Sequence, residues 1–155
     1  MQFCQYDSPI APLWLGEENG RLSLLVFSKD DSRLQGYVDG TTPLLEQAKK
    51  QLDEYFSGRR KQFEIPLVLH GTEFQQRVWR ELQAIPYGQT HTYKEVAVRV
   101  ECPKGSRAVG LANNRNPISI IIPCHRVVGQ NGKLTGYAGG LDSKQHLLDL
   151  EQRYV

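Results

Sequence analysis

The sequence is poor in cysteine, with three in 155 residues, and none of them belongs to a Cys-x-x-Cys pair. So sparse and odd a set argues against a disulfide framework and against a cysteine-rich zinc site. Cys4 and His70 are two candidate metal ligands, but two fall short of a tetrahedral site. We therefore expect no metal and no other cofactor, and a free thiol that a reducing compartment keeps available.

The sequence also lacks an apolar run long enough to span a bilayer, and its first residues lack the basic-then-apolar pattern of a secretory leader. Hydrophobic residues make up 39% of the chain and charged residues 23%, which is ordinary for a soluble protein with a buried core. We expect a cytoplasmic protein with no membrane partner.

The sequence has almost no excess of either charge sign, since its formal net charge is +2. The charge is nevertheless unevenly distributed along the chain. Residues 1–70 carry 8 Lys and Arg against 10 Asp and Glu, a balance of −2. Residues 71–155 carry 11 against 7, a balance of +4. Any polyanion site is therefore expected in the second part, although solvated surface charge explains the same numbers.

The first part of the chain is predicted to combine short strands with one helix. Residues 22–27 form a mostly apolar run between turn-forming residues, which is typical of a buried strand. Pro43 opens a segment with apolar residues at helical spacing, and Gly58 is placed to end it. The character of the sequence then changes, so we predict two domains, residues 1–70 and residues 71–155.

Two capping-box patterns in the second part predict where helices begin. They pair Thr72 with Gln75 and Thr92 with Glu95. A tight turn follows the second of these helices, and a short helix is predicted over about residues 106–113. This succession is the pattern of a helix-turn-helix element.

Three further local predictions concern the segment that follows. Residues 118–122 are a β-branched run that predicts a buried strand leading to Cys124. Asn131-Gly132 is a strong signal for a β-hairpin. The last predicted helix has Ser143 as its expected N-cap.

Cys124 is the candidate nucleophile, because it stands beside a histidine and an arginine. Neighbouring positive charge lowers the pKa of a thiol, and the thiolate is the reactive form. His125 is a candidate general base. The alternative is an inert structural cysteine, since free cysteines are among the most buried residues.

Glu151 is a third candidate member of this site. It lies four residues after Leu147 on the apolar face of the last predicted helix, where a carboxylate needs a partner or a proton. Facing His125, it would orient the imidazole, as in a nucleophile–base–orienter triad. Alternatively, fraying at the end of the helix leaves Glu151 in water.

The short helix over residues 106–113 has an unusual composition, with Arg107 as its one long cation among small side chains. Small side chains let a backbone approach a nucleic-acid groove closely, and a lone arginine can enter the duplex there. Close packing in a protein core explains the same pattern. The small residues are Ala108, Gly110 and Ala112.

The order and spacing of these residues resemble the 6-O-alkylguanine-DNA alkyltransferases, also called methylated-DNA–protein-cysteine methyltransferases. Residues 121–128, Ile-Ile-Pro-Cys-His-Arg-Val-Val, are similar to that family's active-site signature. The resemblance covers about residues 72–153 strongly and the N-terminal part in outline. The other matching segments are Arg107-Ala108-Val109-Gly110, Asn116-Pro117, Gly136-Tyr137-Ala138-Gly139-Gly140-Leu141, and Leu147-Leu148 followed by Glu151.

The resemblance implies an α+β (α/β) fold with a small ribonuclease H-like N-terminal domain and a C-terminal helix-turn-helix, winged-helix-like alkyltransferase domain. It implies DNA repair by direct reversal, in which an alkyl group moves from the 6-O position of guanine to Cys124 after base flipping through the minor groove. The thioether is never cleaved, so one molecule repairs one lesion. The expected partner of this monomer is double-stranded DNA with alkylated guanine; alkylated thymine and cooperative binding on DNA stay open.

The resemblance also implies roles for individual residues at the reacting centre. His125 would deprotonate Cys124 through a bound water, with Glu151 orienting the histidine. Asn116 would be the hinge that ties the recognition helix to the active-site segment.

Other residues would handle the DNA and the flipped base. Arg107 would fill the gap that the flipped base leaves. Tyr93 would help to rotate the nucleotide and donate a proton toward the departing guanine oxygen. The remaining DNA contacts are assigned to Thr92, Lys94, Ala108, Gly110, Ala112 and Arg115. The alkylguanine pocket is assigned to Tyr137, Ala138, Gly139 and Lys144.

Three other interpretations compete with DNA repair. A thiol hydrolase that uses Cys124 and His125 would recover its thiol, and it would have no need of Arg107 on a helix-turn-helix. A non-enzymatic sensor of alkylated DNA, known among relatives of this family, would lack the acceptor cysteine. A plain helix-turn-helix DNA-binding protein would keep its function in Cys124→Ala.

Overall fold

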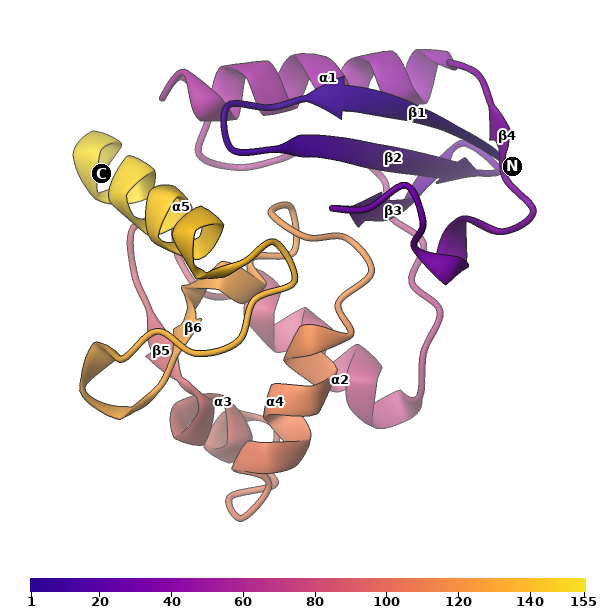
Figure 1. Cartoon of the computed structure of the whole chain (residues 1–155). Helices are drawn as coiled ribbons and strands as arrows, with labels where there is room; N and C mark the ends of the chain where they lie inside the picture. The colour runs from indigo at the N-terminus through magenta and orange to yellow at the C-terminus, as the bar shows by residue number, and fades with distance from the viewer. The chain divides into compact units, whose positions relative to one another are not determined.

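The computed structural model describes all 155 residues, which form two compact units, Met1–Leu69 and His70–Val155. Each unit contains helices and strands, and the expected α+β class is confirmed (Figure 1). None of the helices combines the length and the apolar character that crossing a membrane requires.

The first unit is a four-stranded sheet with one helix packed on it (Figure 1). Its elements are β1 (Gln2–Asp7), β2 (Pro12–Glu18), β3 (Arg21–Val26), the 3-10 helix η1 (Ser32–Leu34), β4 (Val38–Asp39) and α1 (Pro43–Phe56). The strand order is β3-β2-β1-β4, in which β2 is antiparallel to both β1 and β3, and β4 is parallel to β1.

Local sequence signals account for the elements of this unit. β3 confirms the predicted buried strand, since five of its six residues are buried. α1 starts at Pro43 as predicted, and the Thr42 hydroxyl caps it by accepting a hydrogen bond from the Leu45 amide at 3.1 Å. Gly58 follows the helix with a φ of +78°, the left-handed conformation that commonly ends helices.

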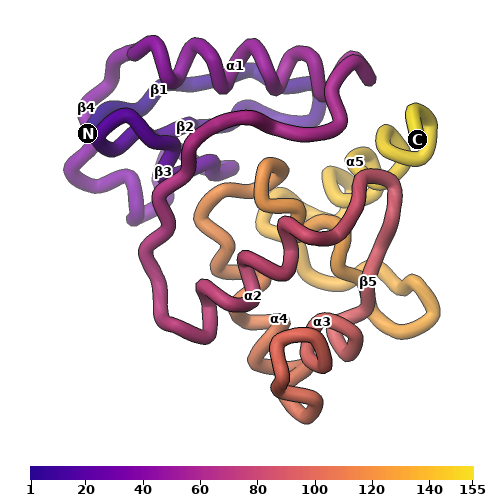
Figure 2. The backbone as a smooth tube through the Cα atoms, turned by 180° about the vertical axis from the view of Figure 1, so that it is seen from behind, coloured from indigo at the N-terminus to yellow at the C-terminus, as the bar shows by residue number.

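The second unit is mainly helical and carries all the residues that the sequence nominates for chemistry. Its elements are α2 (Glu73–Gln83), β5 (His91–Thr92), α3 (Tyr93–Arg99), α4 (Ser106–Asn114), the 3-10 helix η2 (Cys124–Arg126), β6 (Val127–Val128), the 3-10 helix η3 (Gln130–Gly132) and α5 (Leu141–Tyr154). The strands β5 and β6 pair in parallel. Figure 2 shows α2, α3 and α4 clustered together from behind.

The helix-turn-helix prediction is confirmed by α3 and α4, which pack against each other across a tight turn. Both predicted capping boxes form, with Thr72 and Gln75 at the start of α2 and Thr92 and Glu95 at the start of α3. The turn needs a glycine at position 105, because a Cβ there would collide with the sulfur of Cys102.

The predicted strand over residues 118–122 is wrong, because this segment forms tight turns. Ile120 has a φ of +73°, which no strand allows. The Asn116 side chain replaces a strand partner: its Oδ1 accepts from the Ile118 amide at 3.0 Å, and its Nδ2 donates to the Ile122 carbonyl at 2.7 Å. These two bonds satisfy buried backbone groups that a sheet would otherwise satisfy.

Two smaller predictions are also wrong. Asn131 and Gly132 have the positive φ values of a tight turn, +62° and +74°, but no pair of antiparallel strands flanks them, because β6 pairs with β5 instead. Ser143 does not cap the last helix. That helix begins at Leu141 after Gly140, so Ser143 lies inside its first turn.

Trp79 joins α2 to α4, the second helix of the helix-turn-helix. Its side chain is 2% exposed, and its indole nitrogen donates a hydrogen bond to the Ala112 carbonyl at 2.9 Å. The bond anchors the C-terminal turn of α4, where the Ala112 carbonyl also accepts a hydrogen bond from the Arg115 amide at 3.1 Å.

Replacing Trp79 with Phe should lower the free energy of unfolding by about 1–3 kcal/mol, because it leaves a cavity and a buried carbonyl with one partner fewer. Urea unfolding followed by circular dichroism measures this loss. Trp14→Phe is the matched control, since Trp14 is half-buried in the first unit. Equal losses for the two variants would contradict an anchoring role for Trp79.

Candidate active site

Cys124 is the first residue of η2, and only 4% of its surface is exposed. Burial raises the pKa of its thiol. Hydrogen bonds with Asn116 and Ser119 act in the opposite direction, as does the charge of Lys144, but burial is the larger effect. Neighbouring positive charge thus lowers this pKa as expected, but burial outweighs it, so the free protein holds Cys124 as a neutral thiol.

His125 and Glu151 meet in the core of the second unit, with 2.7 Å between Nε2 and Oε2. Both side chains are almost inaccessible, at 0% and 1% exposure. Burial lowers the pKa of the imidazole and outweighs the opposite influence of Glu151, so His125 is neutral at neutral pH. Because Nε2–H donates to the carboxylate, Nδ1 carries the lone pair, and no protein group bonds to it.

Glu151 does not fray into water, as one alternative held. Besides His125, it accepts two hydrogen bonds from Arg126, at 2.8 Å from Nε and 3.0 Å from Nη2, and one from the Gly88 amide at 3.3 Å. Burial alone would raise the pKa of this carboxyl, but the hydrogen bonds from His125 and Arg126 and the positive charge of Arg126 lower it. Glu151 is therefore an ionised carboxylate held on several sides.

Arg126 is the residue of this site whose role sequence reasoning missed. It was considered only as a charge near the thiol, yet it is 7% exposed and forms a two-point pair with Glu151. Its Nη1 donates to the Ile85 carbonyl at 2.7 Å, just beyond the end of α2. The available signal was an arginine within an otherwise apolar segment, because a buried arginine requires a carboxylate partner.

Lys144 and Tyr93 converge on the backbone of Thr135, in the loop between η3 and α5. The Lys144 ammonium donates to the Thr135 carbonyl at 2.9 Å, and the Tyr93 hydroxyl donates to the same oxygen at 3.2 Å. Lys144 is fully buried, and burial lowers the pKa of its ammonium to about 8. The structure therefore brings these two predicted site residues together.

The other predicted pocket residues lie on the same loop. The Tyr137 hydroxyl is shielded from solvent, and burial raises the pKa of its phenol; the negative charge of Glu151 acts in the same direction. Ala138 is exposed and Gly139 is half-buried. Tyr137 thus lies close enough to Glu151 to be influenced by its charge, while the next two residues lie toward the surface.

A groove of about 470 Å³ opens between α4 and this loop. Arg107 and Gly110 line it, and Ala108 lies exposed on the same helix. The expectation that Ala112 contacts DNA with its side chain is corrected, because this residue is 3% exposed and packs in the core. The groove residues are Tyr93, Ser106, Arg107, Gly110, Leu111, Asn114, Thr135 and Gly136.

The remaining predicted DNA contacts have distinct positions. Lys94 is exposed on the first turn of α3, and Arg115 is exposed just after α4. The Thr92 hydroxyl accepts from the Glu95 amide at 3.1 Å, so it is engaged in capping α3. Leu111, which sequence reasoning passed over, lies exposed in the groove; the signal was an apolar residue one helical turn after Arg107.

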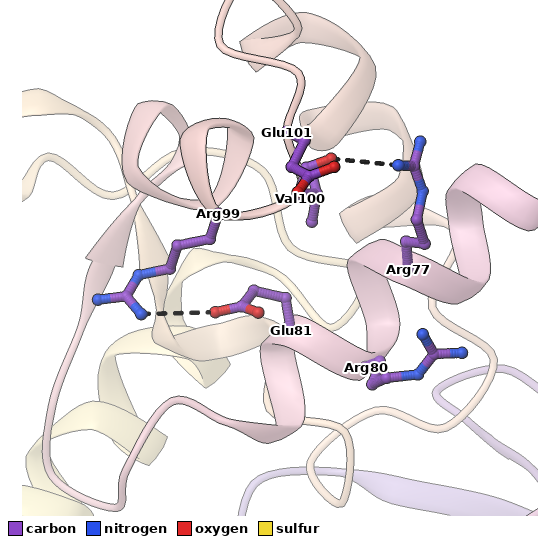
Figure 3. Close-up of a pocket in the computed structure, with 6 residues that line it drawn as sticks. All are labelled: Arg77, Arg80, Glu81, Arg99, Val100 and Glu101. Atoms are coloured by element: carbon purple, nitrogen blue, oxygen red, sulfur yellow. Dashed lines mark hydrogen bonds and ion pairs between the residues drawn. The ribbon is translucent and has the colours of Figure 1, made fainter.

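A second pocket, of about 270 Å³, lies beside α2 and α3 and is shown in Figure 3. Arg77 donates to the Val100 carbonyl at 3.3 Å, and Arg99 lies 3.7 Å from Glu81. Arg80 points away from both pairs in Figure 3. The lining of this pocket has two carboxylates among three arginines but no thiol, hydroxyl or imidazole, so we do not consider it the site of nucleophilic chemistry. The structure contains no group of three or more potential metal ligands.

Two family models match this chain and together cover most of it. Residues 3–69 match the ribonuclease-like domain of 6-O-methylguanine DNA methyltransferase, and residues 73–153 match its DNA binding domain. Among curated relatives, a methylated-DNA–protein-cysteine methyltransferase of Methanosarcina acetivorans is 49% identical over 154 residues, covering 97% of this chain and 98% of the relative. The constitutive enzyme of that name from Bacillus subtilis is 45% identical over 152 residues, covering 94% and 92%.

Solved structures agree with these matches. The crystal structure of Mycobacterium tuberculosis OGT in complex with DNA has a TM-score of 0.92 and 45% sequence identity, and the match covers 99% of this chain and 94% of that one. Fold and site thus define a two-domain protein that joins a buried Cys–His–Glu group to a helix-turn-helix. The chain belongs to the 6-O-methylguanine DNA methyltransferase family, which confirms the resemblance and the expected domain types.

Replacing Glu151 with Gln should make the free energy of unfolding less dependent on pH under acidic conditions. The folded-state pKa of Glu151 is depressed, so its contribution is complete above the ordinary carboxyl pKa of about 4.3 and is lost as the pH falls through the folded value. Urea unfolding at pH ~7 and pH ~3 should therefore show a larger loss of stability in the wild type than in the variant.

The control for this experiment is Asp149→Asn, an exposed carboxylate on the same helix. That variant should lose as much stability on acidification as the wild type. An equally large loss in Glu151→Gln would show that the buried carboxylate is not ionised by its partners.

Proposed function

We propose that this protein repairs DNA by transferring a methyl or other alkyl group from the 6-O position of guanine in a duplex to the sulfur of Cys124. The observation that carries the proposal is the buried Cys124–His125–Glu151 group, which lies in the same unit as a helix-turn-helix in a member of this family. The relatives named above are methylated-DNA–protein-cysteine methyltransferases, and one solved relative is bound to DNA.

The target atom lies inside a stacked duplex, so the base must first leave the helix, at a cost of roughly a few kcal/mol. A lesion that pairs badly costs less to extrude, which favours damaged bases. The groove beside α4 is the proposed entry face, where Arg107 occupies the gap in the duplex. Tyr93, from α3, rotates the nucleotide toward the loop that carries Tyr137.

Proton removal accompanies the attack. The thiol of Cys124 is protonated in the free protein, and the neutral His125 presents Nδ1 as the base, through a bridging water as the family resemblance implies. Glu151 holds Nε2 and stabilises the imidazolium that forms. The sulfur–carbon bond forms as the carbon–oxygen bond breaks, and guanine leaves with a proton from Tyr93 on its oxygen.

The product explains why the protein is consumed. A thioether is stable in water, because its carbon is not part of a carbonyl group to which water could add. A thiol hydrolase would instead pass through an ester that water cleaves and would recover Cys124. Transfer therefore needs no cofactor, and one monomer repairs one lesion. Since the Cys124 thiol must stay reduced and meet DNA, we propose an intracellular location.

Mixing the protein with a short duplex that contains one 6-O-methylguanine should raise its intact mass by one methyl group per chain. Peptide mapping should place the methyl on Cys124. Cys124→Ala should gain no mass and still bind the duplex, while Cys102→Ala, which removes a cysteine outside the site, should gain it as the wild type does. Unchanged wild-type mass with tight binding would identify a damage sensor, and no binding would reopen the hydrolase interpretation.

Replacing Arg107 with Ala should slow methyl transfer from duplex DNA much more than transfer from the free 6-O-methylguanine base. The reason is that only the duplex has a gap to fill once the base is extruded. Single-turnover rates on the two substrates measure the difference. Arg80→Ala, an arginine outside the groove, should alter neither rate. Equal losses on both substrates would assign Arg107 to the chemical step or to folding.

A further inference from the structure

We propose that Leu111 is an apolar wedge that enters the minor groove of the DNA next to Arg107 and packs against the base step beside the flipped nucleotide. This inference rests on the proposed function and adds a residue that sets the affinity for duplex DNA. It follows from the position of Leu111 on α4, from its exposure and from the chemistry of the groove.

Leu111 lies four residues after Arg107, so the two side chains are neighbours on one face of α4. The other face is buried and comprises Val109, Ala112 and Asn113. Leu111 is 63% exposed, although α4 has a buried face on which a leucine could pack. Its side chain is therefore directed outward with Arg107.

The surroundings distinguish Leu111 from an ordinary exposed leucine. Single apolar residues scattered on a protein surface are common and by themselves indicate no binding site. Leu111 instead lines the 470 Å³ groove, together with Tyr93 and Arg107. The groove contains no carboxylate, and neither does α4, so nothing in it repels a polyanion. An apolar side chain beside a cation fits the floor of a DNA minor groove.

Leucine belongs to the side chains that proteins insert between base steps to unstack and bend a duplex toward the major groove. Unstacking costs less next to a nucleotide that has already left the helix. With Arg107 in the gap and Leu111 one helical turn away, α4 would contact the gap and the adjacent base step of the duplex. Leucine makes no hydrogen bond, so this contact would add affinity without reading the sequence.

Leu111→Ala should lower the ratio of the duplex rate to the free-base rate about tenfold at subsaturating protein, since it removes several buried carbon atoms from the complex. The salt dependence of duplex binding should keep its slope, because no phosphate contact is lost. Leu111→Met should restore most of the ratio, as methionine also serves as a wedge. The matched control is Val98→Ala, a 55% exposed aliphatic residue of α3 outside the groove, which should keep the wild-type ratio.

A fluorescent base tests the wedge directly. A duplex with 2-aminopurine next to 6-O-methylguanine should brighten on binding wild-type protein, because the wedge unstacks that base, and it should brighten far less with Leu111→Ala. The same brightening with both proteins, or a changed salt slope, would overturn the proposal.

Two further outcomes would also overturn the wedge. An unchanged rate ratio in Leu111→Ala, while the wild type still transfers methyl to Cys124, would remove Leu111 from the interface and leave the proposed function intact. Concentration-dependent dimers of the wild type that Leu111→Ala abolishes would show that a second copy covers this residue. If the wild type gains no methyl at all, the proposed function itself fails.

Discussion

The arrangement of the second unit depends on one buried carboxylate. Glu151 extends from α5 and receives hydrogen bonds from His125 and Arg126 in η2 and from the Gly88 amide. Arg126 continues the network to the Ile85 carbonyl beyond α2. Removing one partner of such a buried pair costs about 3–5 kcal/mol, because the other charge is left without compensation. The position of the histidine is therefore fixed by interactions that also hold three segments of the unit together.

This network also sets the protonation of the reacting groups. If Glu151 faced His125 alone, its full charge would favour a protonated imidazole, which cannot act as a base. Arg126 shares the carboxylate, and burial then lowers the pKa of His125. Burial likewise keeps Cys124 as a thiol, and a neutral buried thiol resists oxidation and stray alkylation. Low reactivity toward other reagents suits a residue that reacts only once and irreversibly.

The parts of the fold that follow from short-range chemistry were predictable from the sequence. Both capping boxes and the start of α1 depend on residues a few positions apart, and the apolar spacing of α5 pointed to a buried Glu151. The segment 118–122 was not predictable from its β-branched residues, because the Asn116 side chain satisfies its backbone. The role of Arg126 was hidden for a similar reason: its partner lies 25 positions away in the chain.

The same long-range bonds connect recognition to chemistry. The buried face of α4 is tied to α2 by Trp79, and Asn113 on that face donates to the Cys124 carbonyl at 3.4 Å. Asn116, just after the helix, holds the turns that lead to η2. The exposed face of α4 and the Cys124 thiol are thus held in fixed relative positions by the same buried contacts. In the proposed reaction, a nucleotide displaced by Arg107 would therefore meet a thiol whose distance from the helix is already set by packing, so that the entropy cost of positioning it is met during folding.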